Sequence, residues 1–174
     1  MARFMSSVKL FAVFLSLLTV LHVSYQDEEV NDEVEEDISN GYGNKINWVG
    51  DIDAAFEVSA TENKPLMVII HKSWCGACKS LKSKFKDSTD ILELSKDFVM
   101  VNLQDEDEPD DEKFKPDGGY IPRILFFGSD GVFREDLVGP NEKYKYYVPD
   151  PLKIMDNMKK ALSSQHITRS TDEL

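Results

Sequence analysis

Short apolar runs in the middle of the chain predict strands. Residues 66–70 are a continuous apolar run, and residues 98–103 are apolar except for Asn102; both have the length expected of strands that are buried in a sheet. A third run, 121–127, is followed by the turn signal Gly128-Ser129-Asp130-Gly131. The turn predicts a hairpin, in which a further strand begins at Val132.

Helical patterns separate these runs. An aspartate cap predicts a helix over about 51–61, and apolar residues three to four positions apart predict another over about 75–86. A second helical piece covers 90–96, and Asp150-Pro151 begins a last helix. One arc of that last helix carries its apolar residues: Ile154, Met155, Met158, Ala161 and Leu162. Strands that alternate with helices predict an α/β fold, in which a central mixed sheet is flanked by helices on both faces.

The two ends of the chain predict a route through the secretory pathway. Arg3 and Lys9 precede an apolar run over 10–23, which predicts a signal peptide over residues 1–24. A membrane anchor is the alternative, although a span needs about 20 apolar residues. The chain ends in a sequence that resembles the retrieval signal of the endoplasmic reticulum: Thr171, Asp172, Glu173 and Leu174. Together these signals predict the endoplasmic-reticulum lumen, a retrieval receptor as a partner, and membrane contact only through the signal peptide.

The acidity of the chain belongs to two segments. The formal net charge is −12, and 15 of the 32 acidic residues lie in 27–37 and 105–112. Nucleic-acid binding requires clustered cations, so no nucleic-acid partner is expected. The first run predicts an acidic disordered arm over 25–44. The second lies in a loop over 104–120, which is either solvated or a weak calcium site without the ligand spacing of an EF-hand.

These segments flank a single expected domain over 45–165, with a flexible tail over 166–174 that carries the retrieval signal. The domain contains both cysteines of the chain, Cys75 and Cys78. Two cysteines are too few for a framework of structural disulfides, and no second Cys or His cluster completes a zinc site, so no metal is expected.

The position of the cysteine pair predicts redox chemistry. A buried strand ends near His71 and a helix begins near Cys75, so the sulfur of Cys75 lies at a helix N-terminus, where free N–H groups favour a thiolate. Cys78 lies one turn further, on the apolar side. The spacing predicts a redox disulfide in which Cys75 is the nucleophile and Cys78 resolves the mixed disulfide. The alternative is a static disulfide, although so short a loop removes little chain entropy.

The string Trp74-Cys75-Gly76-Ala77-Cys78-Lys79, preceded by a buried strand, resembles the thioredoxin active site. With Pro116-Asp117-Gly118-Gly119-Tyr120-Ile121-Pro122-Arg123, it is similar to the small endoplasmic-reticulum thioredoxins that are grouped with the anterior gradient proteins. The resemblance covers about 45–165. It implies a thioredoxin fold, a cis bond between Ile121 and Pro122 that faces the site, and supporting roles for Trp74, Gly76 and Ala77.

The resemblance also implies an activity. It implies a protein-disulfide oxidoreductase, of the glutathione-dependent reductase or the isomerase type, which reduces, forms or rearranges disulfides in secretory client proteins. No tightly bound cofactor is expected, and glutathione is a candidate redox partner. The two cysteines distinguish the chain from anterior gradient members that keep one.

Several residues depart from the thioredoxin pattern. The buried acid that thioredoxins carry six residues before the first cysteine is replaced by Ile69, which implies slower resolution or another proton route. Ala77 stands where disulfide isomerases have a histidine. These departures keep a second function open, a noncovalent chaperone or adaptor for secretory clients with weak redox activity. His71 is either a proton relay or a half-buried, hydrogen-bonded residue, and Arg123 contacts either a client or a carboxylate.

Overall fold

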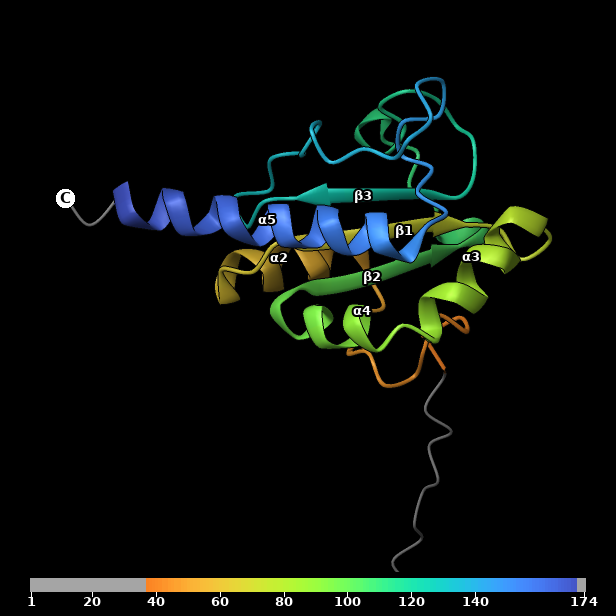
Figure 1. Cartoon of the computed structure of the whole chain (residues 1–174), viewed down its shortest axis with the longest axis horizontal. Helices are drawn as coiled ribbons and strands as arrows, with labels where there is room; N and C mark the ends of the chain where they lie inside the picture. Colours follow the sequence, from red (N-terminus) through yellow and green to blue (C-terminus); the bar gives the residue numbers. More distant parts are fainter. Residues whose placement is uncertain (1–36, 172–174) are drawn as a thin grey trace, which may run out of the picture. The chain divides into compact units, whose positions relative to one another are not determined.

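The structure is a computed structural model that describes residues 37–171, with side chains through residue 164 (Figure 1). The predicted signal peptide, residues 25–36 of the predicted acidic arm, and the retrieval residues 172–174 lie outside the described residues. Within the described part, no helix combines the length and the hydropathy that a membrane crossing needs.

Three strands form one mixed sheet, which is the predicted architecture (Figure 1). β1 (Leu66–His71) lies in the centre, parallel to β2 (Val99–Gln104) on one side and antiparallel to β3 (Arg123–Phe127) on the other. Every residue of β1 and β3 is buried, because both faces of the sheet are covered. The continuous apolar runs therefore occupy the doubly buried positions that they predict.

Helices cover both faces, as predicted. α2 (Ile52–Glu62) packs on the face that carries Leu66, Val68 and Ile70. The opposite face, which carries Met67 and Ile69, is covered by α3 (Gly76–Lys86), α4 (Thr89–Leu94) and α5 (Pro151–Thr171). The apolar arc predicted for the last helix faces this core, with Ile154, Met158 and Ala161 buried and Met155 and Leu162 partly buried. A short 3₁₀ helix, η1 (Ser95–Asp97), follows α4.

The predicted hairpin partner of β3 is reduced to a single bridge. Phe133 pairs with Phe127 in an isolated antiparallel bridge, and Arg134 N donates to Phe126 O at 2.9 Å. The chain then turns away, with Leu137 N bonded to Arg134 O at 3.3 Å. The prediction of a strand beginning at Val132 is therefore wrong in extent, because a turn follows the first bridge and ends the ladder.

The folded region differs from the predicted one at both ends. Tyr42 is fully buried in the core, and Trp48 Nε1 donates to Gly43 O at 2.9 Å. The predicted acidic arm is thus too long at its C-terminal end, because residues 37–44 pack against the domain. At the other end, α5 continues to Thr171, so residues 166–171 of the predicted flexible tail are helical.

Candidate active site

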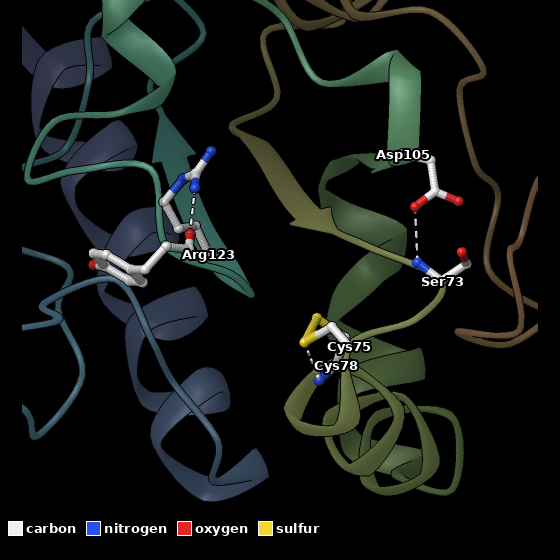
Figure 2. The surroundings of a disulfide bond; sticks show 6 residues. Ser73, Cys75, Cys78, Asp105 and Arg123 are labelled. Carbon is white, nitrogen blue, oxygen red and sulfur yellow. Dashed lines mark hydrogen bonds between the residues drawn. A yellow bond between two sulfur atoms is a disulfide. The ribbon is translucent and has the colours of Figure 1, made fainter.

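Cys75 and Cys78 form a disulfide at the start of α3 (Figure 2). Cys75 is the N-cap of the helix, and the N–H of Cys78 donates to Cys75 Sγ at 3.1 Å. Cys75 is 7% exposed and Cys78 is 1% exposed, which matches the expectation that the second cysteine is the more shielded. Cys75 is therefore the more accessible residue of the pair.

The helix N-terminus favours negative charge on Cys75 after reduction. The bond from the Cys78 N–H to the sulfur is already present in the disulfide form, and the first turn of α3 carries no acidic residue. Lys84 and Lys86 in the last turn complement the opposite end of the helix dipole. The amide and the dipole both stabilise a thiolate more than a neutral thiol, so this position favours a reactive Cys75 sulfur.

The segment that follows the acidic loop lies at the same end of the sheet. The bond between Ile121 and Pro122 is cis, as the resemblance implies. Arg123 pairs with Ile70 across β1 and β3, one residue before β1 ends at His71 and leads toward Cys75. The topology therefore brings the cis bond and the cysteine turn to one edge of the sheet.

The residues around the cysteines present an open surface. Trp74 is 73% exposed, and Gly76 and Ala77 are also exposed. Nothing lies within 4 Å of the position that a Cβ on Gly76 would occupy, so the turn itself does not require a glycine there. The exposed indole of Trp74 thus belongs to the residue that directly precedes Cys75.

No carboxylate replaces the missing buried acid on β1. Ile69 is fully buried, and His71, two residues further on the same face, is also fully buried rather than half-buried as predicted. His71 Nε2 lies 3.3 Å from Asn102 Oδ1, and the centroid of its ring lies 4.9 Å from that of Tyr42. Burial lowers the pKa of His71 to about 4, so the ring is neutral at neutral pH and does not take up a second proton there.

The buried imidazole predicts a loss of stability in mild acid. An unfolded histidine takes up its proton near pH 6.5, whereas His71 in the folded protein resists until about pH 4. The contribution of the neutral His71 to the free energy of unfolding is therefore fully present above pH 6.5 and falls between pH 6.5 and 4. We expect the free energy of unfolding to drop by about 2 kcal/mol from pH 7.5 to pH 5 in urea denaturation. His71→Gln should remove this drop.

The matched control for this prediction is His166→Gln, which should keep the same pH dependence. A drop that persists unchanged in His71→Gln would assign it to other groups. The carboxylates titrate mainly below this window, since their ordinary pKa values lie near 4. The measured quantity is the change in the free energy of unfolding between pH 7.5 and pH 5, so a loss of stability that is equal at both pH values in His71→Gln does not affect it.

The acidic loop is tied to the cysteine turn and is not simply solvated. It contains two 3₁₀ turns, η2 (Asp105–Asp107) and η3 (Glu112–Phe114). Asp105 Oδ1 accepts the N–H of Ser73 at 2.9 Å, on the turn that leads from β1 to Cys75 (Figure 2). Within the described residues no group of three or more His, Cys, Asp or Glu side chains could hold a metal ion.

Glu108 of this loop forms an ion network, and the sequence analysis did not single out this residue. Its Oε2 lies 2.9 Å from Lys72 Nζ, and its Oε1 accepts a bond from the fully buried Arg123. Arg123 also donates to Phe114 O at 3.0 Å and to Tyr120 O. Burial alone would raise the pKa of Glu108, but bonds from Lys72 and Arg123 hold it below its usual value. Arg123 therefore contacts a carboxylate, which decides between its two predicted roles.

Comparison with known proteins identifies the family. A family model described as thioredoxin-like matches residues 47–129. The anterior gradient protein 2 homologue of Pongo abelii is 33% identical over 164 residues, covering 87% of this chain and 93% of that protein. Anterior gradient protein 3 of Mus musculus is 39% identical over 128 residues, covering 72% and 76%. The chain belongs to the anterior gradient family.

The fold of this anterior gradient protein is that of thioredoxin. The solution structure of a thioredoxin from Thermus thermophilus superimposes with a TM-score of 0.51 at 14% identity, covering 68% of this chain and 88% of that one. The predicted fold class is confirmed. The family and the Cys-x-x-Cys disulfide at the start of α3 together support a disulfide-related function.

Proposed function

We propose that this anterior gradient protein is a thiol–disulfide oxidoreductase that acts on secretory client proteins in the lumen of the endoplasmic reticulum. The observation that carries the proposal is the Cys75–Cys78 disulfide at the helix N-terminus, with the more exposed sulfur bonded to a backbone N–H. A static disulfide would need neither this placement nor the difference in shielding between the two sulfurs.

The geometry supports a two-step exchange. The Cys75 thiolate attacks a client disulfide, a bond forms between Cys75 Sγ and one client sulfur, and the other client sulfur leaves as a thiolate. Cys78 then loses its proton and attacks Cys75 Sγ, which releases the reduced client and closes the Cys75–Cys78 disulfide. Two electrons pass to the client. Two glutathione thiols, oxidised to glutathione disulfide, would restore the dithiol, and the reverse sequence oxidises a client.

Three finer features belong to the proposal. The predicted signal peptide and the tail Thr171-Asp172-Glu173-Leu174 support entry to the lumen and recognition by the retrieval receptor. The Trp74-Cys75-Gly76-Ala77-Cys78 string supports a two-cysteine protein of the kind represented by thioredoxin domain-containing protein 12. Glutathione is the proposed electron partner, and no bound cofactor takes part.

The test is a trap for the mixed disulfide. Cys78→Ser leaves Cys75 able to attack but removes the resolving thiol, so covalent complexes between the variant and a disulfide-containing peptide should accumulate. We expect the wild type to show less than about a tenth of the complex, because the intramolecular attack by Cys78 is fast relative to bimolecular release. Non-reducing gels and mass spectrometry of the complex measure the effect.

The matched control is Ser80→Ala, an exposed position of the same helix, which should behave as the wild type. A Cys78→Ser protein that folds but captures no peptide at Cys75 would contradict the oxidoreductase. Reduction of the complex with dithiothreitol should release peptide and protein intact.

A noncovalent chaperone or adaptor is the second candidate. Two observations favour it, namely the fully buried Ile69 in place of a proton-accepting carboxylate and the 73% exposure of Trp74. It requires that client capture survive in the Cys75→Ser/Cys78→Ser double variant and weaken in Trp74→Ser. Loss of capture in the double variant would leave the oxidoreductase as the function.

A further inference from the structure

Two segments frame the disulfide, and one carboxylate joins them. The first is the turn Lys72–Cys75, which leads from β1 into α3. The second is the segment Tyr120–Arg123, which contains the cis bond and enters β3. They lie 45 or more positions apart in the chain, yet Glu108 binds Lys72 through Oε2 and Arg123 through Oε1.

The first segment is fixed by bonds that converge on Lys72. The N–H of Cys75 donates to Lys72 O at 3.2 Å, so the backbone of Lys72 sets where the N-cap cysteine begins. The Lys72 ammonium meets Glu108 Oε2 at 2.9 Å and also donates to Asp105 O. Beside it, the N–H of Ser73 is held by Asp105 Oδ1 at 2.9 Å. The acidic loop therefore holds the start of this turn through the Lys72 ammonium and the N–H of Ser73.

The second segment is fixed through Arg123. Its guanidinium is 0% exposed and donates to Phe114 O, to Tyr120 O and to Glu108. Tyr120 is held in turn, since its hydroxyl donates to Asp117 at 2.8 Å and accepts the N–H of Tyr146 at 2.9 Å. A buried guanidinium without its counter-charge is costly, so Glu108 is the group on which this arrangement depends.

From this juxtaposition we propose that Glu108 is a positioning residue that sets the distance between the cysteine turn and the cis-proline segment. These two segments form the surface on which an extended client chain lies while its disulfide reacts. The inference rests on the proposed function. A client polypeptide must pass over both segments to reach Cys75, whereas a small reagent needs only the sulfur. Loss of Glu108 should therefore slow the reaction with a polypeptide substrate more than the reaction with a small reagent.

The test compares two reactions in Glu108→Gln. Misplacement of a binding surface by a fraction of an ångström is costly for an extended substrate. We expect kcat/KM for reduction of a peptide disulfide to fall about three- to tenfold, mainly through KM, while iodoacetamide alkylates Cys75 of the protein previously reduced with dithiothreitol within about twofold of the wild-type rate. A fall that affects both reactions equally would overturn the proposal, because it would place the effect on the sulfur or on the fold.

The matched control is Glu106→Gln, the same change at an exposed position of the same loop, which should leave both rates unchanged. A Glu108→Gln protein that matches Glu106→Gln with the peptide would also overturn the proposal. Should Glu108→Gln fail to fold, Lys72→Met breaks the link from the more exposed side and should give the same split between substrates. The effects of Glu108→Gln and Lys72→Met should be less than additive in the double variant, since both changes remove the ion pair between Lys72 and Glu108.

The wild type separates this inference from the proposed function. If wild-type protein reduces the peptide and Glu108→Gln does so equally well, only the positioning role fails. If wild-type protein and all variants lack turnover while iodoacetamide still modifies Cys75, the oxidoreductase itself fails.

Discussion

Cys75→Ser is expected to abolish turnover of a disulfide substrate, with a loss of at least about 10³-fold in kcat/KM. The serine hydroxyl is not ionised at neutral pH and cannot form a disulfide, so both the attack and the closing step disappear. The helix cap survives, because a serine oxygen can accept the N–H that Cys75 Sγ accepts from Cys78. A glutathione-coupled assay with a peptide disulfide measures the loss.

Two measurements test whether the loss of turnover comes from the missing sulfur and not from a change in the fold. The circular dichroism spectrum of Cys75→Ser should match that of the reduced wild type, since the substitution preserves volume and capping. The Ser80→Ala control should keep full activity. Residual turnover above about a tenth of the wild-type rate in Cys75→Ser would show that Cys75 is not the nucleophile.

Arg123→Met is expected to have the largest effect on stability, with a loss of about 3 kcal/mol in the free energy of unfolding. The substitution keeps the length of the side chain but removes the charge that Glu108 faces, and it leaves the carbonyls of Phe114 and Tyr120 without their donor. Urea denaturation of the reduced proteins at pH 7.5 measures the change.

A second variant tests whether the loss comes from the unpaired charge. Arg123→Met/Glu108→Leu removes both members of the pair, and it should recover part of the loss, because no buried charge then remains uncompensated. Arg134→Met is the control, since its partner Asp136 is largely exposed and a surface pair contributes little. An Arg123→Met protein that is no less stable than Arg134→Met would show that the buried network contributes nothing to the fold.

The parts of the fold that depend on local pattern could be predicted. The strands 66–70 and 98–103 are buried, so their residues are apolar except for Asn102, and the structure moves their ends by only a residue. The early end of the second strand of the β3 hairpin was not predicted, since Val132-Phe133 has strand composition while a local bond from Leu137 N to Arg134 O turns the chain away. The burial of Tyr42 could not be predicted either, because Tyr42 lies just after an acidic run with the composition of a disordered segment.

The candidate site also has one part that could be predicted from the sequence and another that could not. Cys75 and Cys78 lie in a short string whose placement at a helix N-terminus could be predicted from position, whereas the cis bond at Pro122 is implied by the resemblance to thioredoxins. The pairing of Glu108 with Lys72 and Arg123 could not be predicted, because contacts across 15 or 36 positions leave no periodic signal. One signal was available, namely an arginine inside an otherwise apolar strand. Such a side chain requires a buried counter-charge, and the acidic loop is its nearest source.

The positions of the two tryptophans give the molecule two separate optical reporters. Trp48 is 7% exposed in the core, and Trp74 is 73% exposed in the residue before Cys75. Fluorescence from an indole beside a disulfide is quenched by the sulfur–sulfur bond, and an indole in the core shifts its emission to the red when water reaches it. Intensity from Trp74 would therefore follow the oxidation state, while the wavelength of Trp48 would follow unfolding, so one label-free cuvette experiment could record both events.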